Sequence, residues 1–152
     1  MDVYRLATAR RATDLSGEGA RRAGGRWNRV GTAVLYTASS RALATLEVLV
    51  HVPMAFLPDT YRMLTLTVPD DSMQTLPSEL LPAGWDGLFP PLAAKQLIDD
   101  WIADNRFLLL RVPSAVVEGD YNFLINPAHD RATAVQLIGN QPYQFDARLF
   151  KP

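Results

Sequence analysis

The chain has 152 residues, of which 48% are hydrophobic and 20% charged, as is typical of one globular domain and not of a disordered or fibrous chain. A formal net charge of −1 argues against the global positive field of nucleic-acid binders. The absence of cysteine excludes disulfides, thiolate metal sites and a cysteine nucleophile, and with only two histidines we expect no metal site.

The first half of the chain is predicted to contain two strands, a polar loop and a helix. Val3–Leu6 and residues 33–37 carry the apolar and β-branched residues of strands, whereas residues 8–22 are predicted as a polar loop, either irregular or with a helical turn. Residues 41–51 have helical spacing. Ser39 or Ser40 would provide the N-cap of this helix, and Pro53 follows its end.

The second half is predicted to mix strands and one helix without a regular βαβ alternation. In chain order the expected elements are strand 61–68, loop 70–91, helix 92–103, strand 107–112, strand 123–125 and strand 134–138. The loop assignment is based on the prolines and glycines of that stretch. This order of elements favours an α+β fold over a parallel α/β fold.

The termini and the charge distribution give further expectations. The N-terminus lacks the apolar segment of a signal peptide, and no apolar run approaches the roughly 20 residues of a membrane span, so we expect a soluble cytoplasmic protein. Residues 1–41 hold eight arginines against three acidic residues, a local charge of +5. These arginines indicate either a phosphate-binding site or an ordinary solvated face.

A carboxylate falls within the apolar positions of the predicted helix 41–51. Leu43, Leu46, Glu47 and Val50 have the spacing of one helix face, so we expect this stripe to face the core with Glu47 inside it. A buried charge must be paired or hydrogen-bonded. Glu47 is therefore either a functional carboxylate or the partner of an arginine from the first forty residues.

Residues 24–28 have the sequence Gly-Gly-Arg-Trp-Asn. Adjacent glycines allow a ligand to approach the backbone, Arg26 offers a planar fork to a diphosphate or carboxylate, and Trp27 can anchor the segment in the core. The segment matches neither the Walker nor the Rossmann pattern. It is either a ligand-binding loop or a simple hairpin turn.

Ser114 follows the predicted strand 107–112 and Pro113. Its flanking residues do not form the Gly-x-Ser-x-Gly elbow of hydrolases, so a catalytic triad is not favoured. A serine at this place is either a hydrogen-bonding residue of a site or a turn residue.

Together these segments resemble a known family. Their order and spacing over about residues 3–138 are similar to those of the RES-domain toxins of bacterial toxin–antitoxin pairs, whose name records an Arg, a Glu and a Ser. The segments that carry the resemblance are Thr13–Ala20, Gly24–Asn28, Gly31, Leu35–Ala38, Ala44–Glu47, Arg111–Ala115 and Asn122–His129.

The resemblance implies one ADP-ribosyltransferase-like domain over residues 1–152, with twisted, mostly antiparallel sheets flanked by helices. It also implies an enzyme that consumes NAD as its substrate without a metal. The catalytic set carried over is Arg26, Tyr36, Glu47 and Ser114. The residues expected to contact NAD are Arg5, Gly25, Arg26, Asn28, Tyr36, Ser114, Asn122 and Asn126.

The implied function is that of a toxin which cleaves the nicotinamide–ribose bond of NAD, by hydrolysis or phosphorolysis, and so halts growth. The implied partner is an Xre-type helix-turn-helix antitoxin, with no direct contact to nucleic acid or membrane. One alternative is transfer of ADP-ribose to a protein by the same site. An alternative of another class is an RNA-binding module that uses the arginine-rich N-terminal region.

Overall fold

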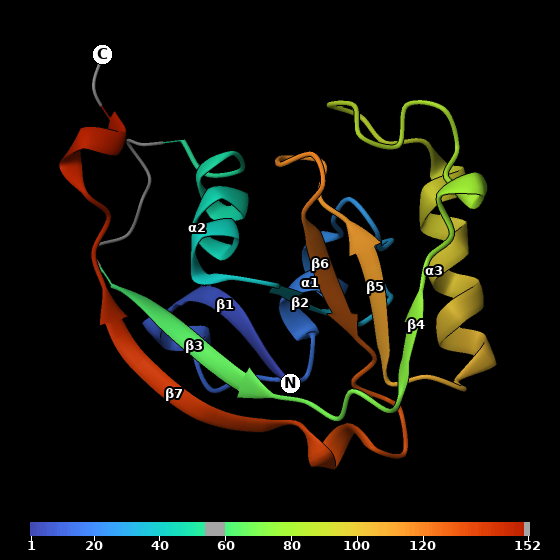
Figure 1. Cartoon of the computed structure of the whole chain (residues 1–152), viewed down its shortest axis with the longest axis horizontal. Helices are drawn as coiled ribbons and strands as arrows, with labels where there is room; N and C mark the ends of the chain where they lie inside the picture. Colours follow the sequence, from blue (N-terminus) through green and yellow to red (C-terminus); the bar gives the residue numbers. More distant parts are fainter. Residues whose placement is uncertain (54–59, 151–152) are drawn as a thin grey trace.

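The computed structural model describes residues 1–53 and 60–150, and one seven-stranded sheet organises them in the order β4-β5-β6-β2-β1-β3-β7 (Figure 1). The strands are β1 (Asp2–Thr8), β2 (Leu35–Ala38), β3 (Tyr61–Thr67), β4 (Met73–Thr75), β5 (Leu109–Pro113), β6 (Tyr121–Ile125) and β7 (Gln136–Tyr143). The helices are α1 (Glu18–Ala23), α2 (Arg41–Leu49) and α3 (Leu92–Asp104). Within the described residues every pairing except the parallel β4–β5 pair is antiparallel.

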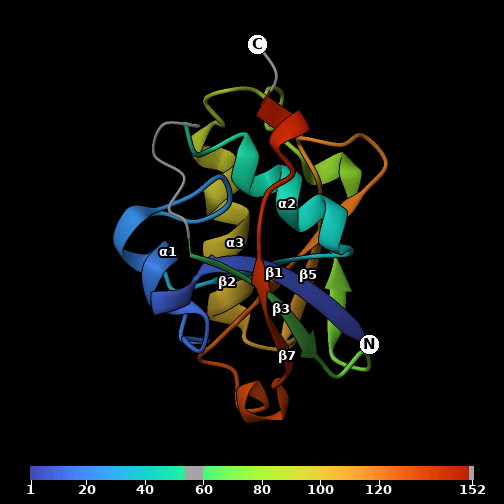
Figure 2. The same ribbon diagram turned by 90° about the vertical axis from the view of Figure 1, so that its left-hand side faces the viewer.

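The sheet has two wings that diverge from a narrow junction. Strands β1, β3 and β7 form one wing, and β2, β4, β5 and β6 form the other. The register between β1 and β2 consists of the single pair Tyr4–Ala38, whereas β1 and β3 pair from Asp2 to Thr8. Figures 1 and 2 show the two wings twisted away from each other, with α2 above the junction. Because the wings diverge, they can leave a cavity between them while the strands of the sheet remain continuously paired.

The hydrophobic core has separate parts on the two faces of the sheet. Helix α3 packs against the wing that contains β5 and β6 (Figure 1), and Ile98 and Trp101 of this helix are buried there beside Trp27. Burial of such large apolar side chains contributes about 1.5–3 kcal/mol each to folding, before entropy is counted. This packing fixes the segment around Trp27 to the body of the protein.

Helix α2 begins at the expected cap and packs on the other wing. The Ser40 side chain accepts a hydrogen bond from the Leu43 N–H, as an N-cap residue does. Leu43 and Ala44 are buried against Leu6 and Met63 of strands β1 and β3. The helix is thereby fixed above the end of β2.

The predicted α+β class is confirmed, and most expected elements lie within a few residues of their observed bounds. Two predictions of local structure are wrong. The stretch predicted as loop 70–91 contains β4 and a 3₁₀ turn, Ser78–Leu80. The strand predicted at 134–138 begins at Gln136 and continues to Tyr143. The polar loop 8–22 contains the helical turn that was one of its two expected forms, because residues 18–22 belong to α1.

Candidate active site

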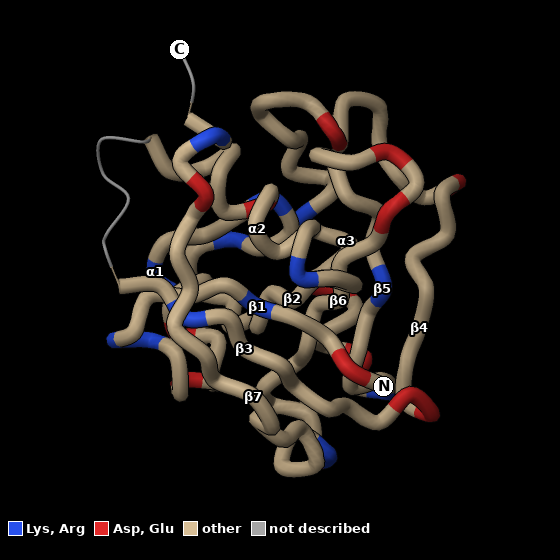
Figure 3. Tube along the Cα trace, turned by 60° about the vertical axis from the view of Figure 1, so that its left-hand side comes forward, with Lys and Arg blue, Asp and Glu red and all other residues tan. Residues whose placement is uncertain are grey.

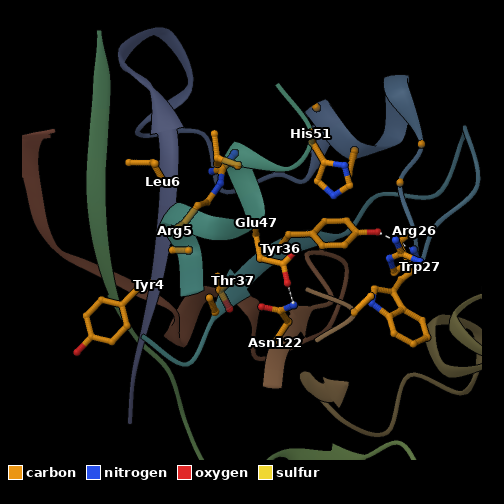
Figure 4. Close-up of a pocket in the computed structure, with 18 residues that line it drawn as sticks. Tyr4, Arg5, Leu6, Arg26, Trp27, Tyr36, Thr37, Glu47, His51 and Asn122 are labelled. Atoms are coloured by element: carbon orange, nitrogen blue, oxygen red, sulfur yellow. Dashed lines mark hydrogen bonds between the residues drawn. The ribbon is translucent and has the colours of Figure 1, made fainter. Parts of the chain in front are cut away.

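A cavity of about 510 Å³ opens between α2, β1, β2 and the segment that follows α1 (Figure 4). This volume is within the range of about 300–1,000 Å³ that is usual for small-molecule sites. Backbone and apolar groups form much of its lining. The polar and aromatic side chains that line it are Tyr4, Arg5, Arg26, Trp27, Tyr36, Thr37, Glu47, His51 and Asn122.

One wall of the cavity is built around the carboxylate of Glu47. Its Oε1 accepts a hydrogen bond of 2.9 Å from the Ser114 hydroxyl and one of 2.6 Å from the Asn122 amide. Helix α2 supplies Glu47, the end of β5 leads into Ser114, and β6 supplies Asn122. We call these three residues the carboxylate wall. Within the described residues both bonds go to Oε1, which leaves Oε2 available to a ligand.

The hydroxyl of Ser114 uses its donor and both of its acceptor positions in hydrogen bonds. It donates its proton to Glu47 and accepts hydrogen bonds of 3.1 Å from the backbone N–H groups of Val116 and Val117. Ser114 is itself buried, and its neighbour Ala115 lines the cavity. The serine therefore orients the carboxylate from behind.

The predicted burial of the Glu47 stripe is wrong in detail. Leu46 and Val50 are exposed, at 37% and 55%, and the buried face of α2 consists of Leu43, Ala44 and Thr45. Glu47 lies at the edge of that face, half-buried, where it meets the cavity. In the described part of the chain its recorded partners are a hydroxyl and an amide and not an arginine, which argues against the structural ion pair.

The opposite wall is formed by Gly25, Arg26, Trp27 and Tyr36, and we call it the arginine wall. The Tyr36 hydroxyl donates to Asn28 Oδ1 at 2.8 Å and accepts from the Trp27 N–H at 3.1 Å. Burial raises the pKa of Tyr36 well above its ordinary value, so the phenol stays neutral. Gly25 is required here because a Cβ would lie 2.8 Å from the Tyr36 hydroxyl.

Arg26 joins the arginine wall to a distant loop. Its Nη1 donates to the carbonyl oxygens of Trp85 and Gly87, both at 2.8 Å. The Trp85 ring stacks on Trp27 at a centroid distance of 5.6 Å. The guanidinium thus anchors the loop at 85–87 while it also lines the cavity.

Arg5 is the second cation of the cavity. Its Nη1 donates to the Asp14 carbonyl oxygen at 2.9 Å, and burial lowers the pKa of its guanidinium, with Asp14 acting in the opposite direction. Arg5 also lines a smaller adjoining cavity of about 190 Å³ next to Gly19 and Tyr36. It therefore lies between two spaces that an extended anionic ligand could occupy.

Other arginines of the first 41 residues are engaged elsewhere. Arg21 and Arg22 pair with Glu18 within α1, and Arg29 pairs with Asp99 of α3 at 2.8 Å. Figure 3 shows the basic positions over α1, β1 and α2. Glu18 is already counted in the local charge of +5, so of these ion pairs only the one between Arg29 and Asp99 reduces that charge.

Two asparagines expected to contact NAD do not line the cavity. Asn28 is fully buried, and its amide donates to the carbonyl oxygens of Ala20, Arg29 and Thr32. It supports the arginine wall from behind. Asn126 is buried beyond the end of β6, where its amide donates to Asn105 Oδ1, so it lies outside the site.

Several lining residues were not identified from the sequence. Tyr4 and Thr37 lie on strands whose residues alternate between faces, and no motif marked them. His51 follows Glu47 by four residues, a spacing that would have placed both on one helix face. Figure 4 shows the His51 ring pointing toward Tyr36 from the end of α2. Trp27, expected to anchor its segment, does so and also lines the cavity.

Neither a metal cluster nor a membrane helix is found in the described ranges. Among residues 1–53 and 60–150 no group of three or more His, Asp or Glu side chains is placed to hold a metal ion. No helix there is long and apolar enough to cross a bilayer.

The fold and the site together define a class of small α+β proteins with an oriented carboxylate facing two arginines across one cavity. Comparison with known proteins identifies the family within this class. A family model described as the RES domain matches residues 2–146. The chain belongs to the RES-domain family, as the sequence resemblance predicted.

The relatives that this chain resembles are toxins. It is 39% identical to a protein named Prs ADP-ribosylating toxin from a Sphingobium species, over 97% of this chain and 96% of that protein. It is 32% identical to a protein named Toxin Res from Photorhabdus laumondii, over 99% of this chain and 98% of that one. It also superimposes on a chain of the M. tuberculosis MbcT–MbcA toxin–antitoxin complex, with a TM-score of 0.72, 25% identity and coverage of 94% and 84%.

Proposed function

We propose that this protein is the toxin of a toxin–antitoxin pair and that it consumes NAD by cleaving the nicotinamide–ribose bond. The observation that carries the proposal is the carboxylate wall, in which Ser114 and Asn122 hold Oε1 of Glu47 beside a cavity that also contains two arginines. The names of the related toxins support it.

Glu47 has the chemistry that this cleavage requires. Departure of nicotinamide leaves positive charge on the ribose, in an oxocarbenium-like state similar to that of glycoside hydrolysis. A fixed carboxylate stabilises that charge most when it is already oriented and partly shielded from water. The two hydrogen bonds on Oε1 provide the orientation, and Oε2 would face the ribose.

The arginine wall suits the other parts of the substrate. A diphosphate prefers a planar guanidinium, and Arg5 and Arg26 both line the cavity. The Tyr36 ring, fixed by Trp27 and Asn28, offers an aromatic surface to nicotinamide. In this proposal Ser114 and Asn122 position the carboxylate and do not attack the substrate.

The acceptor of ADP-ribose is water or phosphate in the first form of this proposal. Incubation of the purified protein with NAD, with and without phosphate, tests it by the masses of the products. ADP-ribose indicates hydrolysis, and ADP-ribose 1″-phosphate indicates phosphorolysis. Unchanged NAD under both conditions would overturn the proposal.

Transfer of ADP-ribose to a protein is the second candidate. It is favoured by the 39% identity to a toxin whose name specifies ADP-ribosylation of Prs. Labelled NAD incubated with the toxin and purified Prs separates the two forms. A labelled Prs band with little free ADP-ribose would favour transfer, and free ADP-ribose without labelled protein would favour cleavage.

We further propose an Xre-type helix-turn-helix antitoxin as the partner. The toxin–antitoxin complex to which the fold is similar supports an antitoxin, and the Xre type is what the family resemblance implies. Expression of the toxin alone should arrest growth and lower cellular NAD, and co-expression of the neighbouring antitoxin gene should relieve both. Arrest by both the wild type and Glu47→Gln at normal NAD would instead favour the RNA-binding alternative.

A further inference from the structure

We propose that His51 is the base that accepts the proton of the acceptor during NAD cleavage, an inference that rests on the proposed function. His51 lines the same cavity as Glu47 and Tyr36. Its backbone N–H donates to the Val48 carbonyl oxygen at 3.1 Å, so the turn after α2 keeps it close to the helix end. Figure 4 shows its ring directed toward the Tyr36 ring, which also lines the cavity.

The position of His51 suits contact with an incoming acceptor. Its side chain is exposed, unlike those of Glu47 and Tyr36, which are deeper. An acceptor that enters from solvent therefore meets the imidazole at the mouth of the cavity before it reaches the ribose. An exposed imidazole can also pass the proton on to bulk water and return to its starting state.

The other polar groups of the cavity are unsuited to this proton transfer. Glu47 is needed as an anion opposite the ribose and is already bonded on Oε1. The Tyr36 hydroxyl donates to Asn28, and burial raises its pKa. Three further groups are excluded by their chemistry or contacts: the cationic donors Arg5 and Arg26, and Thr37, whose hydroxyl donates to the Phe123 carbonyl oxygen.

Tyr4 is the remaining polar lining residue that could take a proton. It lies on β1, and the guanidinium of Arg41 stands 5.0 Å from the centre of its ring. A neutral phenol still carries its own proton, whereas a neutral imidazole has a free ring nitrogen that can accept one, so histidine is the better base.

The proposed reaction replaces one bond to C1′ of the ribose with another. The bond between C1′ of the nicotinamide ribose and the ring nitrogen breaks, and its electron pair leaves with nicotinamide. When water is the acceptor, its oxygen forms the new bond to C1′, and its proton goes to the unprotonated ring nitrogen of His51. The imidazolium then releases that proton to solvent. Glu47 stabilises the ribose throughout and neither gains nor loses a proton.

Azide provides a direct test because it attacks carbon without losing a proton. Wild type and His51→Gln would each be incubated with NAD in buffer containing azide, and ADP-ribose and azido-ADP-ribose would be separated by mass. We expect hydrolysis by His51→Gln to fall by about 10²-fold, as for loss of a general base. We expect the ratio of azide product to hydrolysis product to rise by a similar factor. This ratio does not depend on how much of the variant is folded.

The controls separate a failure of this inference from a failure of the proposed function. His129→Gln removes the other histidine, which is half-buried and accepts a hydrogen bond from the Arg131 N–H, and it should behave as the wild type. If the wild type releases no nicotinamide, the proposed function fails. If the wild type is active and His51→Gln or His51→Asn hydrolyses NAD within twofold of it, the role of His51 is refuted. Reduced hydrolysis without a rise in the ratio of azide product to hydrolysis product refutes it equally.

Discussion

The two walls of the cavity are built in opposite ways. The carboxylate wall brings together side chains that are 67 and 75 residues apart, and every contact in it converges on one charged oxygen. The arginine wall comes mostly from one short stretch, and its polar groups largely satisfy one another or the backbone. The conspicuous contiguous motif is therefore largely a scaffold, whereas the group proposed for chemistry is assembled by the fold.

Changing the charge at the carboxylate wall should have the largest effect. In Glu47→Gln the amide oxygen can still accept from Ser114 and Asn122, so the fold should be retained while the negative charge is lost. Loss of such an electrostatic group costs about 10² to 10³ in rate. Nicotinamide release measures the rate, and the thermal midpoint checks folding.

The control for this variant is Glu118→Gln, which makes the same chemical change on the exposed loop that follows Ser114. It should keep full turnover. A folded Glu47→Gln protein with wild-type turnover would make Glu47 a structural residue and would remove the distinction between the two walls.

The arginine wall should respond to a change of volume more than to a change of charge. The Cβ introduced by Gly25→Ala would lie 2.8 Å from the Tyr36 hydroxyl and 2.9 Å from Asn28 Oδ1. We expect a loss of about 1–3 kcal/mol in unfolding free energy, as for overpacking. Urea denaturation measures it.

A second variant tests the cause of that loss. Tyr36→Phe removes the hydroxyl that the new methyl group meets, so Gly25→Ala should cost less in the Tyr36→Phe background. Strictly additive losses in the double variant would show that Gly25 is required for some reason other than this contact.

Arg26 connects the arginine wall to the loop at 85–87, and Arg26→Lys should expose that link. Lysine offers a point charge in place of a planar fork, so we expect NAD affinity to fall about tenfold, which corresponds to 1.4 kcal/mol. Calorimetric titration in the Glu47→Gln background keeps NAD intact during the measurement. Equal affinity with and without Arg26→Lys would indicate that Arg5, and not Arg26, binds the diphosphate.

The sequence predicted most elements because their signals are local, and it failed where tertiary contacts override them. Strand β7 continues through Gly139 and Pro142, which disfavour strands, because it lies at the edge of the sheet. Its pairing with β3 skips Ile138 in a bulge, and that residue is 57% exposed. Strand β4 is only three residues long in a proline-rich stretch and forms by parallel pairing with β5.

Most residues named by the family resemblance line the cavity or support its walls, but their contacts could not be predicted. Family resemblance identified Glu47, Ser114 and Asn122, yet no local pattern indicates that the last two meet the same oxygen. It also included Asn126, whose amide instead bonds Asn105 at the end of α3. Spacing from Glu47 could have identified His51, because a four-residue interval places side chains on one helix face.

The smallest effect is expected at α1, whose Ala20 carbonyl oxygen accepts a hydrogen bond from the amide of Asn28, the residue that supports the arginine wall. Hydrogen bonds from Arg21 and Arg22 lower the pKa of Glu18 to about 2 from its ordinary 4.5. A carboxyl whose pKa is lowered by folding stabilises the protein above its unfolded pKa, and this contribution is lost as the pH falls through the folded value. The loss should therefore occur between about pH 4.5 and 2. Because the ion pairs are solvent-exposed, the contribution is small and sensitive to salt.

Acid unfolding followed by circular dichroism measures this contribution. Glu18→Gln should be slightly less stable than wild type at neutral pH, and the difference should disappear as the pH approaches 2 and as salt is added. Glu79→Gln, an exposed position in the 3₁₀ turn Ser78–Leu80, serves as the matched control. A difference that persists at pH 2 would mean that Glu18 supports α1 by packing and not by charge. Packing of α1 would then stabilise the arginine wall in addition to the hydrogen bonds within that wall.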